Sequence, residues 1–291
     1  MSDMTNGFFE AKTVWVTGAS SGLGRAMAID LSRRGARVIL SGRNEAALKE
    51  TQGQLAGDSL ILAFETTDME ALPGVVETAL AWSGRLDGLI NNAGISQRSL
   101  IIDTDMAVYR RLMEVDFFAP VALTKLVLPH MIAAGAGHVA IVSSLAGKIG
   151  TPVRSGYCAA KHACVGFFES LRAEVETAYG IGVSVILPGS VQTGISRNAL
   201  SANGDARGVS DANIEGGMKA GVAASLILDG IAAGQTDIVI AEGMEAAALG
   251  LRTSDPDQLF AILAEQGRQL AASAGSDKPI ELRRVNDDTP A

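Results

Sequence analysis

The chain has 291 residues, of which 47% are hydrophobic and 19% are charged, so it lacks the composition of a disordered protein. Its net charge is −8, and its 24 Lys and Arg residues form no basic arm. This charge pattern excludes nucleic acid as an expected partner.

Seven short segments rich in Val and Ile predict buried strands, because each is apolar along its length and has no polar alternate face. They are Thr13–Val16, Arg37–Leu40, Leu60–Phe64, Gly88–Ile90, His138–Val142, Gly182–Leu187 and Asp237–Ile240. Segments of helical length lie between them, among them Gly24–Arg34, Glu45–Leu55, Val108–Met131, Gly156–Tyr179 and Lys219–Ala232. This alternation predicts an α/β fold, a doubly wound parallel sheet with helices on both faces.

One domain over residues 12–242 is the simplest organisation, with an N-terminal tail at 1–11 and a C-terminal helical extension and tail at 243–291. The segment 194–217 is dense in small and polar residues, which predicts a mobile lid loop. We expect the extension to cover a pocket, to join subunits or to touch a membrane surface, in that order.

Three further observations bear on the cellular location, on membrane segments, and on disulfides and metal sites. Residues 1–12 lack the basic flank and apolar run of a secretory signal, so we expect a cytoplasmic protein. The charge-free stretch Pro129–Gly147 contains Gly, Ser and His and is interpreted as a loop leading into a strand, not a transmembrane segment. Cys158 and Cys164 are six residues apart on a predicted helix and cannot bridge, and the isolated histidines predict no metal site.

A glycine-rich loop, Thr17–Gly24, lies between the first predicted strand and the first predicted helix. Glycines there permit a tight turn and let backbone N–H groups approach a pyrophosphate. The spacing is GxxxGxG and not GxGxxG, so an ordinary glycine-rich turn is the alternative to dinucleotide binding.

Thr17–Gly24 resembles the TGxxxGxG motif of the classical short-chain dehydrogenases/reductases. Three further segments agree with that family in order and spacing: Asn91–Gly94, the YxxxK pattern Tyr157–Lys161, and Pro188–Gly189. The resemblance covers residues 12–240, and Val142–Lys148 is similar to the branch of the 11-beta-hydroxysteroid dehydrogenases and related vertebrate carbonyl reductases. It implies a single-domain Rossmann-like fold and a nicotinamide cofactor.

The cofactor-binding residues implied by the resemblance are Gly18, Ser20, Ser21, Gly22, Leu23, Gly24, Arg43, Glu65, Asn92, Ala93, Gly94, Tyr157, Lys161, Val191 and Thr193. Glu65 takes the place of the family's Asp near the adenine amino group, and Val191 and Thr193 would hold the nicotinamide carboxamide. An NAD enzyme needs a carboxylate after the second strand, but this chain has Gly42 there, followed by Arg43. The Arg43 guanidinium suits a 2′-phosphate, so we expect NADP(H).

The catalytic residues implied by the resemblance are Ser144, Tyr157, Lys161 and Asp116, and the substrate would contact Ser144, Leu145 and Tyr157. Hydride transfer to a carbonyl leaves charge on its oxygen, which Ser144 would bind and Tyr157 would protonate. Lys161, one helical turn after Tyr157, would favour the phenolate. Asp116 stands where the family usually has Asn, and we expect it to act through its main-chain carbonyl.

The expected function is an NADP(H)-dependent alcohol dehydrogenase or carbonyl reductase acting on an apolar small molecule. Its pocket would be lined by Leu145, Ile149, Thr151, Val153 and the lid loop. The alternatives are a non-catalytic NADP-binding regulator or scaffold, and an epimerase or dehydratase of the extended family, whose members usually carry a GxxGxxG loop. The two longest helices carry more apolar residues than one sheet face can bury, which favours a homodimer or homotetramer.

Overall fold

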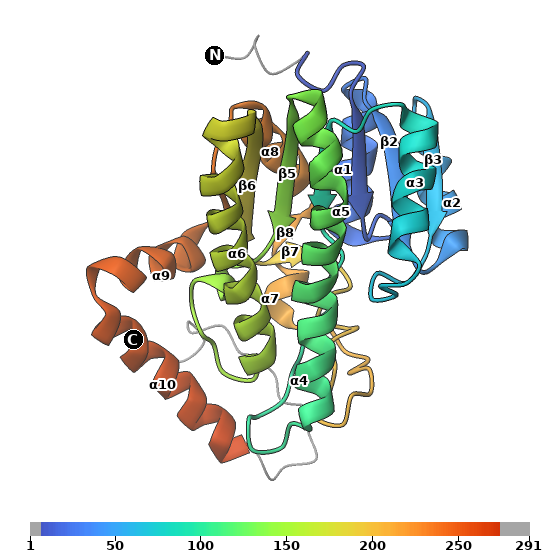
Figure 1. Ribbon diagram of the computed structural model, residues 1–291. Coiled ribbons are helices and arrows are strands. Elements are labelled where there is room, and N and C mark those ends of the chain that lie inside the picture. Colours follow the sequence, from blue (N-terminus) through green and yellow to red (C-terminus); the bar gives the residue numbers. More distant parts are fainter. Residues whose placement is uncertain (1–6, 274–291) are drawn as a thin grey trace.

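The computed structural model describes residues 7–273, in which a seven-stranded parallel sheet has the order β3-β2-β1-β4-β5-β6-β9 (Figure 1). Its strands are β1 (Thr13–Thr17), β2 (Arg37–Gly42), β3 (Ser59–Ala63), β4 (Gly88–Asn91), β5 (Gly137–Val142), β6 (Ile181–Pro188) and β9 (Asp237–Ile240). A two-stranded parallel sheet pairs β7 (Val191–Gln192) with β8 (Met218–Lys219). All seven predicted strands are confirmed.

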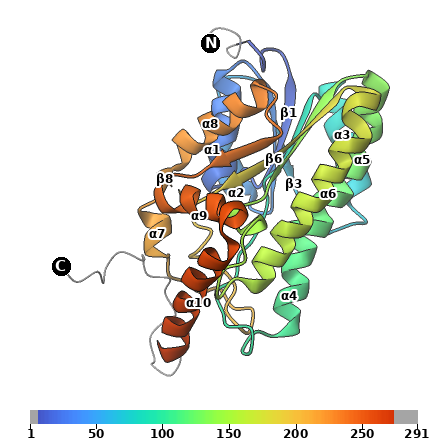
Figure 2. The same ribbon diagram turned by 90° about the vertical axis from the view of Figure 1, so that its left-hand side faces the viewer.

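Helices cover both faces of the sheet, with α1, α2 and α8 on one face and α3, α5 and α6 on the other (Figure 2). The helices are α1 (Gly22–Arg33), α2 (Glu45–Gln52), α3 (Leu72–Ser83), α4 (Met106–Met113), α5 (Ala119–Ala134), α6 (Ser155–Tyr179), α7 (Ala212–Glu215), α8 (Ala220–Ala232), α9 (Gly243–Ser254) and α10 (Pro256–Ser273). Along β1, Val14 and Val16 join one core cluster and Trp15 joins the other. The predicted doubly wound fold is therefore correct.

Two expectations about the middle of the chain need correction. The long helix expected over Val108–Met131 is interrupted by a π-helical segment, η1 (Glu114–Phe118), between α4 and α5. The charge-free stretch from Pro129 begins inside α5 and not in a loop, and Pro129 lies on the exposed side of that helix. The short helix α7 within the expected lid, and the short strands β7 and β8 that flank the lid, had no clear sequence signal.

The continuous helical run Met106–Ala134 is long and apolar enough to cross a membrane by length and composition alone. In this fold, however, it packs on the sheet, and its residues Leu123, Val127 and Met131 are buried in the core cluster shared with α3 and α6. This packing accounts for the apolar residues on its buried face, and buried residues make up 33% of its most apolar window.

The strand order places a crevice at the carboxyl ends of β1 and β4, where successive strands diverge to opposite sides of the sheet. Ligands of open α/β sheets bind at this switch point. The Thr17 hydroxyl accepts hydrogen bonds from the backbone N–H groups of Asn92 (2.9 Å) and Ala93 (3.0 Å). These bonds fix the glycine-rich loop against the segment that follows β4.

Candidate active site

A cavity of about 450 Å³ opens at this switch point, and all the predicted cofactor-binding residues line it. Ser144 also lines it, beside Tyr157 and Lys161. The structure thus brings together residues from four separate motifs. Two predicted residues lie outside the cavity wall: Asp116 is buried behind Lys161, and Leu145 is buried in the core.

The glycine-rich loop is shaped for a close backbone approach. Gly18 and Gly22 have φ angles of +67° and +54°, which favour glycine. A Cβ at Gly24 would collide with the Gly18 carbonyl oxygen and the Asn92 side-chain amide. The first turn of α1 contains no acidic residue, and Ser21 makes no side-chain cap. The N–H groups of this turn therefore fit the pyrophosphate of a dinucleotide, which the helix dipole also favours.

The part of the cavity beside the end of β2 is lined by two arginines that face one carboxylate. Glu65 lies 3.5 Å from Arg43 and 3.3 Å from Arg111, and Arg111 also donates to the Thr67 hydroxyl at 3.1 Å. Burial alone would raise the pKa of Glu65, but Arg111 and Arg43 outweigh it and lower that pKa. Arg111 comes from α4 and was missed by sequence reasoning, since no local motif marks it.

Ser144 lies where the chain leaves β5 and enters a 3₁₀ turn, η2 (Leu145–Gly147). Its hydroxyl accepts a hydrogen bond from the Ala146 N–H at 3.1 Å and donates to the Pro188 carbonyl at 3.3 Å. Tyr157 lies in the first turn of α6 and faces the same cavity. The serine hydroxyl and the phenol therefore reach one space from two different elements.

Lys161 and Asp116 form a buried ion pair directly behind Tyr157. The Lys161 Nζ lies 3.5 Å from Asp116 Oδ2, and the two side chains are 5% and 0% exposed. Nζ also donates to the Val142 carbonyl at 3.0 Å, while the Ile95 N–H donates to Asp116 Oδ1 at 2.8 Å. Burial would lower the pKa of Lys161, but the Asp116 carboxylate outweighs it and raises that pKa. The ammonium charge is thus fixed at this position.

The structure gives Asp116 a larger part than the main-chain role expected from its sequence position. Its carbonyl oxygen accepts a hydrogen bond from the Cys164 thiol at 2.9 Å, and its carboxylate contacts Lys161. The π-helical turn η1 contains Asp116, and the extra residue of such a turn rotates the following helix by about 100° relative to an uninterrupted α-helix. Burial raises the pKa of the Cys164 thiol to about 11, so it remains a neutral donor.

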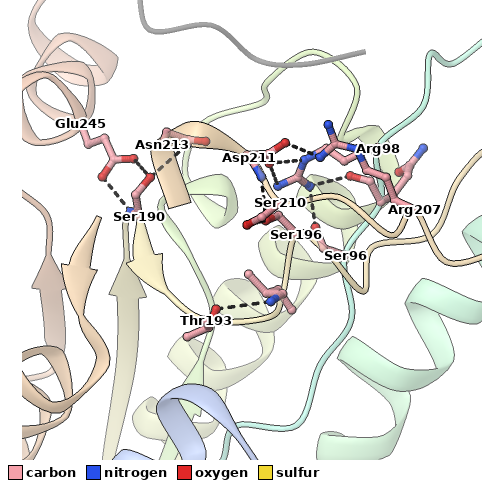
Figure 3. A network of polar contacts seen from close by, with 12 residues as sticks. Ser96, Arg98, Ser190, Thr193, Ser196, Arg207, Ser210, Asp211, Asn213 and Glu245 are labelled. Atoms are coloured by element: carbon pink, nitrogen blue, oxygen red, sulfur yellow. Dashed lines mark hydrogen bonds and ion pairs between the residues drawn. The ribbon is translucent and has the colours of Figure 1, made fainter. Parts of the chain in front are cut away.

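The expected lid is anchored by a buried charge network (Figure 3). Arg98, which follows β4, donates to Asp211 Oδ2 from Nε at 2.7 Å and from Nη2 at 2.6 Å. Arg207 contacts Oδ1 of Asp211. The backbone N–H of Asp211 donates to the Ser196 hydroxyl at 3.1 Å. The Arg98 and Asp211 side chains are 2% and 0% exposed. The segment expected to be a mobile loop is therefore held closed against the loop after β4.

Both partners of this network are titratable groups with shifted pKa values. Burial and the neighbouring Arg154 lower the pKa of Arg98 to about 10, with Asp211 opposing them. Burial would raise the pKa of Asp211, but Arg98 and Arg207 outweigh it and lower that pKa below its ordinary value of 3.8. Both groups are therefore charged at neutral pH.

Asp211→Asn should lower the free energy of unfolding by about 3 kcal/mol at pH 7, because it leaves buried arginine charge without its carboxylate. A depressed folded pKa contributes stability above pH 3.8, and this is lost as the pH falls below that value. Urea unfolding at pH 7 and pH 3 measures both effects. As the pH falls below 3.8, wild type should progressively lose the stability that comes from this lowered pKa. The exposed control Asp103→Asn should follow wild type at pH 7. Equal stability of wild type and Asp211→Asn at pH 7 would contradict this account.

Comparison with known proteins places these observations in a family context. A model described as short chain dehydrogenase matches residues 12–204. The chain is 40% identical to dehydrogenase/reductase SDR family member 7B of Mus musculus, over 90% of this chain and 83% of the relative, and 42% identical to that of Bos taurus, over 88% and 81%.

Solved structures give a consistent fold comparison. A short-chain dehydrogenase/reductase from Burkholderia phymatum in complex with NAD has a TM-score of 0.77 and 24% identity, covering 86% of this chain and 95% of that one. A metagenomic short-chain oxidoreductase in complex with NADP has a TM-score of 0.67 and 26% identity, covering 80% and 97%. Proteins similar to this chain therefore include complexes with either nicotinamide cofactor.

Proposed function

The chain belongs to the short-chain dehydrogenase/reductase family of oxidoreductases, and we propose that it is NADP(H)-dependent and interconverts an apolar carbonyl compound and its secondary alcohol. The observation that carries this proposal is the convergence of Ser144, Tyr157 and Lys161 on the cavity that the glycine-rich loop borders. A nicotinamide cofactor supplies or accepts the hydride when it is bound there.

The proposed roles of the three side chains follow from their placement. Ser144 binds the substrate oxygen through its hydroxyl. Tyr157 gives that oxygen a proton during reduction and removes it during oxidation. Lys161, a fixed buried cation one helical turn away, stabilises negative charge on the phenol oxygen. The Asp116 carboxylate keeps Lys161 charged and reduces the field that Lys161 exerts on Tyr157.

The preference for NADP(H) rests on the charges around the adenosine end. Gly42 ends β2 without a carboxylate, and Arg43 and Arg111 both line the cavity there. Glu65 partly neutralises them, at 3.5 Å and 3.3 Å. Two guanidinium groups against one carboxylate leave a net positive end, which suits the 2′-phosphate.

The apolar character of the substrate is inferred from the lid side of the cavity, which is lined by Ile195, Leu200 and Ile214, together with Ile95 from the loop after β4. Three residues that the sequence predicted to line the pocket are absent from its wall. Ile149 and Val153 are buried outside the cavity, and Thr151 does not line it. The lid therefore supplies apolar side chains to the cavity, and the turn after Ser144 supplies none.

We also propose a homodimer or homotetramer. The support is exposed apolar surface on the α5 and α6 side, where Phe118 is 46% and Tyr179 47% exposed. Light scattering at micromolar concentration should give a multiple of the chain mass, and a monomer mass would exclude the proposal.

The activity is tested by NADPH fluorescence on mixing, followed by turnover with a panel of ketones. We expect binding and NADPH oxidation with apolar ketones, and NADPH binding without any turnover would instead support a cofactor-binding regulator.

Arg43→Ala should weaken NADPH binding by about 1 to 3 kcal/mol, because a charged hydrogen bond is lost, and it should barely change NADH binding. Equal weakening of both cofactors would contradict the phosphate role of Arg43.

A further inference from the structure

The C-terminal extension makes its most direct polar contact with the loop that follows β6. Glu245, in the first turn of α9, accepts hydrogen bonds from Ser190: Oε2 from the backbone N–H at 2.8 Å and Oε1 from the hydroxyl at 2.6 Å (Figure 3). One carboxylate thus binds both donors of one residue. Ser190 directly precedes β7, and β7 starts at Val191.

Ser190 is also tied to the lid. Its hydroxyl accepts a hydrogen bond from Asn213 Nδ2 at 3.0 Å, and its carbonyl accepts one from the Met218 N–H at 2.9 Å. The hydroxyl therefore donates to Glu245 while it accepts from Asn213, a chain in which each bond polarises the next. Every polar group of Ser190 has a partner, so its orientation is fully determined.

The glycine before Ser190 is explained by the same carboxylate. A Cβ at Gly189 would collide with Oε2 of Glu245. Glycine at this position is therefore needed for the close approach of the α9 carboxylate. This gives Gly189 a role beyond that of a plain turn after a strand.

The other end of α9 reaches the loop that follows β5. Arg252 Nε donates to the Lys148 carbonyl at 3.1 Å, and Leu249 packs against the core cluster that contains Leu145 and Leu187. Helix α9 therefore spans the two loops that carry the substrate-binding serine and the nicotinamide-binding segment. Figures 1 and 2 show α9 beside the carboxyl end of β6.

From these contacts we infer that Glu245 is a positioning residue, which holds Ser190 and thereby fixes the segment Val191–Thr193 that is proposed to bind the nicotinamide carboxamide. The inference rests on the proposed function and assigns the extension a part in it. Glu245 touches neither cofactor nor substrate in this account. Ser190 follows β6, whereas the glycine-rich loop follows β1 and Arg43 follows β2, so we expect the loss of Glu245 to affect the nicotinamide end more than the adenosine end.

The discriminating measurement compares two ligands on the full-length chain. NADPH engages the whole cavity, whereas 2′-phospho-ADP-ribose has the adenosine and pyrophosphate but no nicotinamide. For Glu245→Ala, which removes two hydrogen bonds to a charged group, we expect NADPH binding to weaken about tenfold. Binding of 2′-phospho-ADP-ribose should stay within twofold of wild type, and kcat should fall.

Two further variants and a control complete the test. Gly189→Ala should reproduce the selective loss of NADPH binding, since its methyl group displaces the Glu245 carboxylate. Ser190→Ala keeps the backbone bond, so it should give the same selectivity with a smaller loss, and it serves if Glu245→Ala does not fold. The control Glu242→Gln changes an exposed carboxylate three residues earlier and should bind both ligands like wild type.

If the folded variants bind NADPH and 2′-phospho-ADP-ribose more weakly by the same factor, Glu245 supports the fold in general, and the inference would be wrong. Unchanged NADPH binding in all three variants would also overturn it. A wild-type protein that binds no nicotinamide cofactor would contradict the proposed function itself, which is a different outcome from either of these.

Discussion

The buried pair of Lys161 and Asp116 is the interaction on which the rest of the site depends. It joins α6 to the π-helical segment η1, and through the Ile95 N–H it also joins the loop after β4. Neither charge could be buried alone at acceptable cost, so each requires the other. Their pairing fixes the ammonium one turn from Tyr157, beside the cavity.

Much of this site could be predicted from the sequence because its signals are local. The strands are continuous apolar runs, the glycine-rich loop lies between a strand and a helix, and Tyr157 and Lys161 are one turn apart on α6. In each case, neighbouring residues carry the whole signal. The parallel sheet then brings the loops after β1, β4, β5 and β6 to one edge without further information.

The remaining features depend on pairs of residues that are far apart in the chain. Arg98 meets Asp211 and Glu245 meets Ser190 only because the lid and the extension fold back over the sheet edge. Arg111 reaches Glu65 from the last turn of α4. No period or motif marks such pairs, and the π-helical turn that places Asp116 also has no sequence signature of its own.

In this account Tyr157 transfers the proton, Lys161 stabilises the phenolate, and the Asp116 carboxylate weakens that stabilisation. The most direct test is the pH profile of kcat for alcohol oxidation in wild type, Asp116→Asn and Tyr157→Phe. Asp116→Asn should retain activity within about tenfold, a barrier change of roughly 1.4 kcal/mol, and reach half-maximal rate at lower pH, since removing negative charge makes the phenolate easier to form. The kcat of Tyr157→Phe should be several powers of ten below that of wild type. Loss of turnover in Asp116→Asn, or a shift to higher pH, would show that the carboxylate itself transfers protons and would contradict this account.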